Sequence, residues 1–279
     1  MVNFLLSRKP SRQAINEALP AAAGQGHTAI LQTLINSGGN VNGEYGGTAL
    51  MMAAYSGSLD VVQLLLSHGA NVNAVNSDGE TALHYAARAG QQPVEIFRAL
   101  LQQGADVNVR DRDGTTALMK VIQKERPELA LLLLEHNADA TARTNGQETT
   151  LMYAAANNQA SLIEPLVAKG ADVNARNDRG ETSLMWATGA VDRISKPEVV
   201  RALLMNSANI NAVDKNGWSA LMFAASQGEA DIVRILMSRG ADPNLKSKGG
   251  ETALMIATSG QHKETAGVLR EARIAAGRK

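Results

Sequence analysis

The sequence predicts an all-α solenoid of about eight stacked helix-turn-helix units, and two repeating features indicate this fold class. The first feature is a four-residue motif, Thr-Ala-Leu-Met or a near copy. Its copies begin at Thr48, Thr81, Thr116, Thr149, Thr182, Ser219 and Thr252. Successive copies lie 33 to 37 residues apart, a period at which each repeat is one supersecondary unit that buries its apolar face against its neighbours. The second feature is a leucine run followed by a closing segment, as in residues 69–73, Gly-Ala-Asn-Val-Asn.

Residues 1–45 are expected to contain a degenerate N-terminal half-repeat and a capping repeat. The first residues match the second half of a regular repeat without its first half. Val2, Phe4, Leu5 and Leu6 would then leave one apolar flank open, and an open apolar flank favours association. The expected state is a monomer for which this N-terminal half-repeat offers a route to weak self-association.

Six regular repeats are expected over residues 46–249. Each begins with turn residues such as Asn-Ser-Asp-Gly, followed by a threonine suited to cap a helix, as at Thr81. Leu83, Ala86 and Ala87 then have the i, i+3, i+4 spacing of a buried helical stripe. A second, leucine-rich helix completes each unit.

Residues 250–279 are expected to form the C-terminal capping repeat. The segment 265–271, Thr-Ala-Gly-Val-Leu-Arg-Glu, places charge where the other repeats have leucine. The terminal unit of a solenoid needs such a polar outer face. The whole chain, residues 1–279, is therefore predicted to be a single repeat domain.

The ordered features of each unit resemble the ankyrin repeat, whose pattern is G-x-T-P-L-H-x-A-A, then G-H-x-x-V-V-x-L-L-L, then G-A-D-V-N-A. Two positions depart from that pattern. Alanine, threonine or serine replaces the proline, and the histidine survives only as His84. The resemblance implies an ankyrin-repeat solenoid with a hairpin-like turn and two antiparallel helices per repeat. It also implies a non-enzymatic module for protein–protein interaction.

Composition narrows the choice of partner. Lysine plus arginine and aspartate plus glutamate both number 27, so no net charge steers the protein to nucleic acid or to a membrane surface. Cysteine is absent, which excludes disulfides and thiolate metal sites. No apolar run approaches the ~18 residues of a transmembrane helix, and no signal peptide is recognisable. The expected location is cytoplasmic.

No catalytic constellation is apparent, and no cofactor or metal is expected. The five histidines lack metal-ligand spacing. The motif methionines, one per repeat in six repeats, could be a thioether ladder for a soft metal. We favour core packing, because methionine fills irregular apolar gaps and successive repeats would hold the sulfurs too far apart.

Candidate partner-binding residues lie in two places on each repeat. The residue directly after the motif falls, by the resemblance, near the concave side of the array, and it is often aromatic. The second place is the hairpin turn, where basic residues recur. The predicted partner-binding residues are Tyr85, Lys120, Tyr153, Trp186 and Phe223 after the motif, Trp218 before it, and Arg143, Arg176, Arg179 and Lys215 in the turns.

Each of these features has a plainer interpretation. The aromatic rings could be half-covered by the adjacent turn and serve packing within the chain. The turn charges could be solvated tips of little energetic consequence, or else a mixed-charge strip that selects an acidic partner. The function predicted is binding of another protein through the concave face and hairpin tips. The alternative is a regulatory or targeting domain excised from a larger, possibly enzymatic, protein, which the half-repeat at the N-terminus favours.

Overall fold

The computed structural model describes residues 11–90, 93–190 and 196–276, with side chains up to residue 272. The half-repeat expected at residues 2–8 lies outside this range. The described chain forms two compact units, residues 1–139 and 140–279. Each unit is presented by itself, and a single domain over residues 1–279 stays a prediction.

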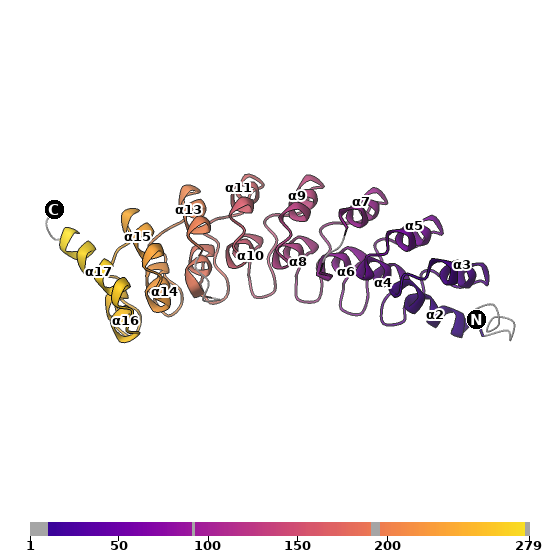
Figure 1. Ribbon diagram of the computed structural model, residues 1–279, viewed down its shortest axis with the longest axis horizontal. Coiled ribbons are helices and arrows are strands. Elements are labelled where there is room, and N and C mark those ends of the chain that lie inside the picture. Colours follow the sequence, from indigo (N-terminus) through magenta and orange to yellow (C-terminus); the bar gives the residue numbers. More distant parts are fainter. Residues whose placement is uncertain (1–10, 91–92, 191–195, 277–279) are drawn as a thin grey trace. The chain divides into compact units, whose positions relative to one another are not determined.

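The described part of the N-terminal unit, from residue 11 onward, contains four helix pairs. Within each pair a first helix is joined to a second, antiparallel one, and Figure 1 shows the first helices in one row and the second helices in another. The degenerate repeat near the N-terminus forms a helix pair like the others. The pairs are α2 (Arg12–Gly24) with α3 (Thr28–Asn36), α4 (Ala49–Ser56) with α5 (Leu59–Ser67), α6 (Ala82–Arg88) with α7 (Val94–Gln102), and α8 (Ala117–Gln123) with α9 (Pro127–Glu135).

The C-terminal unit repeats this arrangement with one irregular pair. There the first helix is a short α-helix that continues as a π-helical turn. Gly189 in that turn has a φ of 108°, and a Cβ atom on it would lie 2.6 Å from Gln227 Cγ. The elements are α10 (Thr150–Ala156), α11 (Ala160–Ala168), α12 (Ser183–Met185), η1 (Trp186–Ala190), α13 (Pro197–Met205), α14 (Ala220–Gln227), α15 (Ala230–Ser238), α16 (Ala253–Ser259) and α17 (Lys263–Ala276).

The motif starts each first helix and fills its core. The hydroxyl of Thr116 accepts a hydrogen bond from Met119 N at 3.4 Å, and the threonine or serine of most other motifs does the same. The motif leucine is buried in every repeat except the last, and so is the motif methionine wherever it occurs. Leu118 and Met119, for example, are both 0 % exposed. Met255 in the final repeat is 57 % exposed. Packing therefore accounts for the buried motif methionines, and the all-α repeat solenoid is confirmed.

Asparagines connect neighbouring pairs at the end of most closing segments, whereas Thr141 stands at this position in the segment after α9. Asn73 Nδ2 donates to Gly104 O at 3.0 Å, and Asn73 Oδ1 accepts from Asp106 N at 2.8 Å. In the C-terminal unit, Asn174 makes the equivalent bonds to Ser207 O and Asn209 N. Each asparagine thus satisfies one backbone donor and one backbone acceptor of the next repeat.

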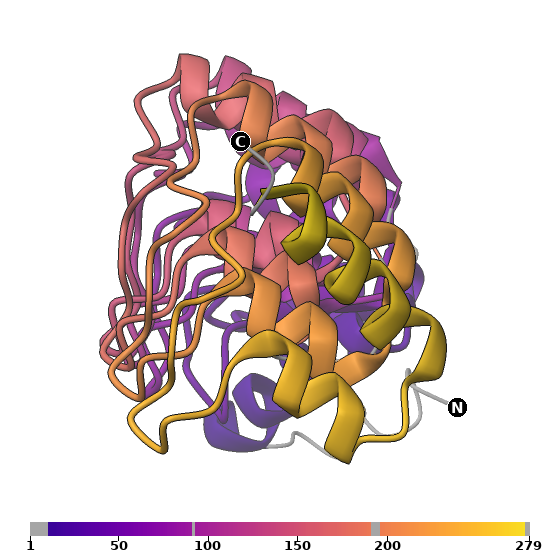
Figure 2. The ribbon, with the colours of Figure 1, turned by 90° about the vertical axis from the view of Figure 1, so that its left-hand side faces the viewer.

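The hairpin turns project to one side of the helices, as the orange and yellow turns of the C-terminal unit show in Figure 2. Within each unit, backbone hydrogen bonds tie neighbouring turns together. Arg112 N donates to Asp78 O at 2.8 Å, and Lys215 N donates to Arg179 O at 2.9 Å. Among the described residues no strand is formed. Two isolated bridges, Arg143 with Thr149 and Val213 with Ser219, are the extent of the pairing there. This backbone ladder holds the side chains of successive turns in register.

Candidate partner-binding site

The first residue of each turn, here named the tip anchor, organises the turn from within. The tip anchors are Asn76, Asp111, Thr144, Asn177, Asp214 and Ser247. Asn76 Oδ1 accepts backbone hydrogen bonds from Asp78 N and Glu80 N, both at 2.9 Å. Asp111 Oδ1 does the same for Asp113 N and Thr115 N. An Asn or Asp at this position therefore holds the turn closed through one side-chain oxygen.

The residue nine positions after each tip anchor is the one directly after the motif, and it faces the anchor. Asn76 Nδ2 donates to Tyr85 Oη at 3.1 Å. Lys120 Nζ lies 2.8 Å from Asp111 Oδ2. We call these residues the facing residues. In each unit, the surface that they form with the tip anchors and the residues before each motif is named the inner strip of that unit. The inner strips of the two units contain the predicted residues Tyr85, Lys120, Tyr153, Trp186, Trp218 and Phe223.

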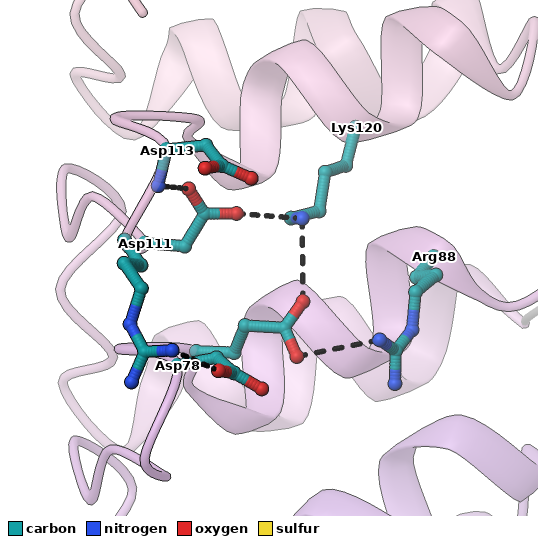
Figure 3. A pocket seen from close by; sticks show the side chains of 7 residues that line it. Asp78, Arg88, Asp111, Asp113 and Lys120 are labelled. Carbon is teal, nitrogen blue, oxygen red and sulfur yellow. Dashed lines mark hydrogen bonds and ion pairs between the residues drawn. The ribbon is translucent and has the colours of Figure 1, made fainter. Parts of the chain in front are cut away.

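In the N-terminal unit the inner strip holds a cluster of charges around Lys120 (Figure 3). Lys120 Nζ bridges two repeats, because it also lies 3.2 Å from Glu80 Oε1. The other oxygen of Glu80 lies 3.3 Å from Arg88 Nη1. The side chains of Glu80 and Asp111 are each 8 % exposed and that of Lys120 is 15 % exposed. Two largely buried carboxylates therefore share one largely buried ammonium.

This cluster lines a polar pocket of about 370 Å³. The exposed Arg112 and Asp78 form its rim and pair with each other at 3.1 Å. The Arg88 guanidinium lies over the Tyr85 ring, 4.6 Å from its centroid, where the negative ring face attracts a cation. The lining residues are Asp78, Glu80, Arg88, Asp111, Arg112, Asp113 and Lys120. Acids and bases alternate, so much of the charge is compensated within the chain.

Two groups of this region have perturbed pKa values. Desolvation is the largest influence on Asp111 and would raise its pKa, but the hydrogen bonds from Lys120 and Thr115 N lower the pKa below its ordinary value. Burial lowers the pKa of His84, which is 1 % exposed. Since Thr115 O can only accept, His84 Nε2 carries the proton at 3.2 Å, and Nδ1 accepts from the Thr81 hydroxyl at 2.9 Å. His84 is therefore a neutral structural link between two repeats.

In the C-terminal unit the inner strip is aromatic. The Tyr153 and Trp186 rings meet edge to face with centroids 5.8 Å apart. The Trp218 and Phe223 rings are tilted, with centroids 5.1 Å apart. Tyr153, Trp218 and Phe223 are half-buried, whereas Trp186 is only 3 % exposed. Half-buried rings present apolar surface in a fixed position, which is the property of an interface anchor.

Glutamates before the motif position two of these rings. Trp186 Nε1 donates to Glu181 Oε2 at 3.0 Å, and Tyr153 Oη donates to Glu148 Oε2 at 2.5 Å. Tyr85, at the equivalent position of the N-terminal unit, is 6 % exposed. Tyr85 and Trp186 thus serve mainly to pack the turn on its helix and offer little surface to a partner.

The predicted turn arginines act largely within the array. Arg143 Nη1 donates to Arg176 O at 3.3 Å, and Arg176 Nη1 donates to Val213 O at 2.5 Å. Arg179 pairs with Glu181 at 3.0 Å. Lys215 is exposed and makes no ion pair with the described residues. Arg143 and Arg176 therefore join neighbouring turns, while Lys215 is presented to solvent.

Sequence reasoning did not assign Arg88, Glu80 and Asp111 to the site, although they complete its charged cluster. A signal for one of these contacts was present. Asp111 and Lys120 are nine residues apart, like the polar pair Asn76 and Tyr85. The contact of Lys120 with Glu80 crosses forty residues and depends on how the repeats stack, so no local spacing could indicate it.

Neither a metal centre nor a membrane span is evident in the described residues. Groups of three or more His, Asp or Glu side chains that could hold a metal ion are not found there. None of the helices in the described ranges is long and apolar enough to cross a bilayer.

The helix pairs, projecting turns and inner strip define a helical repeat protein of the kind that presents an extended surface. The family model described as ankyrin repeats (3 copies) matches residues 1–76, 19–111, 72–144, 93–177, 118–195 and 184–277. The chain therefore belongs to the ankyrin-repeat family. No curated protein matches it. Ankyrin repeats are generally protein–protein interaction modules and are typically non-enzymatic.

Proposed function

We propose that this protein is a non-enzymatic interaction module that binds a partner protein through the inner strip and hairpin tips of its C-terminal unit. The observation that supports this proposal is the half-buried ring pair of Trp218 and Phe223. Both rings are held in place, so little side-chain entropy is lost when a partner covers them. A cytoplasmic location and a monomeric state belong to the same proposal.

The two units differ in how much of the inner strip is free to bind. In the N-terminal unit, Lys120 and Arg88 are already paired with Glu80 and Asp111. A partner would have to compete with these ion pairs. In the C-terminal unit Trp218 and Phe223 offer apolar surface, and exposed Lys215 lies in the same turn as Trp218. This difference favours the C-terminal unit as the contact surface.

Affinity capture with matched variants tests this function. The wild-type chain and the variant Trp218→Ala with Phe223→Ala are immobilised and exposed to lysate of the native host, and retained proteins are identified by mass spectrometry. A protein retained only by the wild type is then purified and titrated by calorimetry. Hot-spot aromatics contribute about 2 kcal/mol or more, so the variant should bind at least ~30-fold more weakly.

Met205→Ala is the control, because Met205 is 77 % exposed but ends the second helix α13, outside the inner strip. It should bind like the wild type. A purified partner that binds the double variant and the wild type equally would refute the assignment to the inner strip.

A further inference from the structure

Each Asn or Asp tip anchor closes its turn with Oδ1. The anchors differ in what contacts the other polar atom of the side chain, and Asp214 differs from the rest. Asn76 donates its amide to Tyr85 Oη at 3.1 Å. Asn177 donates its amide to Glu181 Oε2 at 2.8 Å. Asp111 has a carboxylate oxygen at this position, and Lys120 satisfies it. Each of these anchors therefore has a partner for both of its side-chain polar atoms.

Asp214 resembles Asp111 but lacks the lysine. Its Oδ1 accepts from Asn216 N at 2.8 Å and from Trp218 N at 2.7 Å, as the turn requires. Its facing residue is Phe223, which has no polar side-chain atom. Within residues 11–90, 93–190 and 196–276, no side chain is bonded to Asp214 Oδ2. Asp214 is only 8 % exposed as a residue, but its Oδ2 is not among the described buried atoms that lack a hydrogen-bond partner. This oxygen is therefore open to an approaching cation, which a carboxylate attracts.

The backbone around Asp214 matches that around Asp111. Lys215 N donates to Arg179 O at 2.9 Å, and Arg112 N donates to Asp78 O at 2.8 Å. The turn glycines Gly180 and Gly79 have φ values of 78° and 76° and both abut the next turn. The two anchors and their facing residues are therefore placed alike. A cation beside Asp214 Oδ2 would correspond to Lys120 Nζ beside Asp111 Oδ2.

The side chains around Asp214 suit a cation from outside the chain. Trp218 stands before the motif, where Glu80, Glu148 and Glu181 stand in other repeats. Its ring lies 5.1 Å from that of Phe223, and both are half-buried. Aromatic faces attract ammonium and guanidinium groups, and tryptophan does so most strongly. The carboxylate of Asp214 and the two rings together favour a cationic side chain. A neutral side chain would leave the carboxylate without a counter-ion.

We propose that Asp214, Trp218 and Phe223 form a recognition site for a single lysine or arginine side chain of a partner protein. The partner's cation takes the role that Lys120 has in the N-terminal unit. Exposed Lys215, Lys246 and Lys248 lie in the same and the next turn and repel a run of basic residues, so the site selects an isolated cation flanked by acidic or neutral residues. This inference rests on the proposed function and specifies the chemistry of the partner.

Nuclear magnetic resonance of the full chain provides the test, because the protein has two tryptophans and so two indole signals. The probes are the capped pentapeptide acetyl-Ser-Glu-Lys-Glu-Ser-amide and the same peptide with norleucine in place of lysine. The lysine peptide should shift the Trp218 indole signal with a dissociation constant at least ~10-fold below that of the norleucine peptide, the factor expected for one cation–π and carboxylate contact.

Three variants separate the site from general effects. Asp214→Asn should remove the preference for lysine and still fold, because Asn76 and Asn177 hold equivalent turns through the same pair of N–H bonds. Phe223→Lys supplies an internal cation and should also remove the preference. Met205→Ala should leave the peptide preference unchanged, since Met205 is 77 % exposed at the end of α13, outside the inner strip.

Equal binding of the two peptides by the wild type, or a lysine preference that persists in Asp214→Asn, would overturn the inference. Its failure is distinguishable from failure of the proposed function. A purified partner whose binding needs Trp218 and Phe223 but tolerates Asp214→Asn supports the protein-binding function and excludes the cation site. A partner that tolerates loss of both rings excludes the inner strip altogether.

Discussion

Lys120→Met is the sharpest perturbation of the charged cluster, because it removes the ammonium shared by Glu80 and Asp111 while keeping the apolar stem. Removing one partner of a fully buried ion pair costs about 3–5 kcal/mol. Here Glu80 retains Arg88 at 3.3 Å, and Asp111 retains two backbone N–H donors. The side chain of Lys120 is also 15 % exposed, so water screens part of the interaction. We therefore expect the variant to lose about 2–3 kcal/mol of unfolding free energy at neutral pH.

The pH dependence identifies the cause. In the wild type the lowered pKa of Asp111 stabilises the fold above the unfolded-state pKa of about 3.9, and this contribution is lost as the pH falls through the folded-state pKa. Without Lys120, two of the influences that lower the Asp111 pKa are lost, so we expect this pKa to rise from its wild-type value. As the pH is lowered from neutral toward about pH 3, the ionised fraction of Asp111 falls and with it the need for a neighbouring cation, so the difference between variant and wild type should shrink.

The measurement is urea denaturation followed by circular dichroism at both pH values, with hydrogen exchange of α6 and α8 as the local readout. Repeat arrays can depart from two-state unfolding, and the exchange data restrict the effect to these helices. The double variant Lys120→Met with Asp111→Asn should recover part of the stability, because Asn76 and Asn177 occupy equivalent anchors. A loss that is equal at both pH values would refute the electrostatic account and assign the role of Lys120 to packing.

Three further predictions concern single side chains. Thr141→Asn places an asparagine at the position equivalent to Asn174 and should raise the free energy of unfolding by about 1 kcal/mol. The reason is that its amide can bond one backbone donor and one backbone acceptor of the next repeat, as Asn174 does. An unchanged urea midpoint would contradict this prediction. His84→Met, which installs the residue of the other motifs, should reduce the loss of stability on acidification. The folded-state pKa of His84 is lowered, so the unfolded state binds a proton first as the pH falls below about 6.5, and the wild type loses stability in that window. Thermal denaturation at several pH values should therefore show a melting temperature that depends less on pH in the variant than in the wild type. Trp218→Ala should weaken binding of a purified partner mainly through faster dissociation, which surface plasmon resonance measures. A change in the association rate alone would argue against a packed hot spot at Trp218.

The architecture could be predicted from sequence because it is determined locally and then repeated. Each motif contains its own helix cap, as Thr116 shows by accepting the Met119 N–H. The leucine and alanine spacing places one apolar stripe on each first helix. These features act within one repeat, and copying them at a regular period leaves few ways to bury the stripes other than stacking. Composition alone likewise excludes disulfides, since the chain contains no cysteine.

The roles of the site residues were decided by tertiary structure. The sequence selected Arg143 and Arg176 as partner contacts, yet their guanidinium groups donate to carbonyls of the next turn, 33 and 37 residues away. Lys120 was selected as a contact as well, and it proves to neutralise two acids from different repeats. Asp214 looks unremarkable in sequence because Asp111 has the same place in its own turn. The two carboxylates differ in the residue that the packing of turn on helix brings close to them. Lys120 lies beside Asp111, whereas Phe223 is the facing residue of Asp214. This difference matters because Coulomb interactions depend on distance in space and not on separation along the chain.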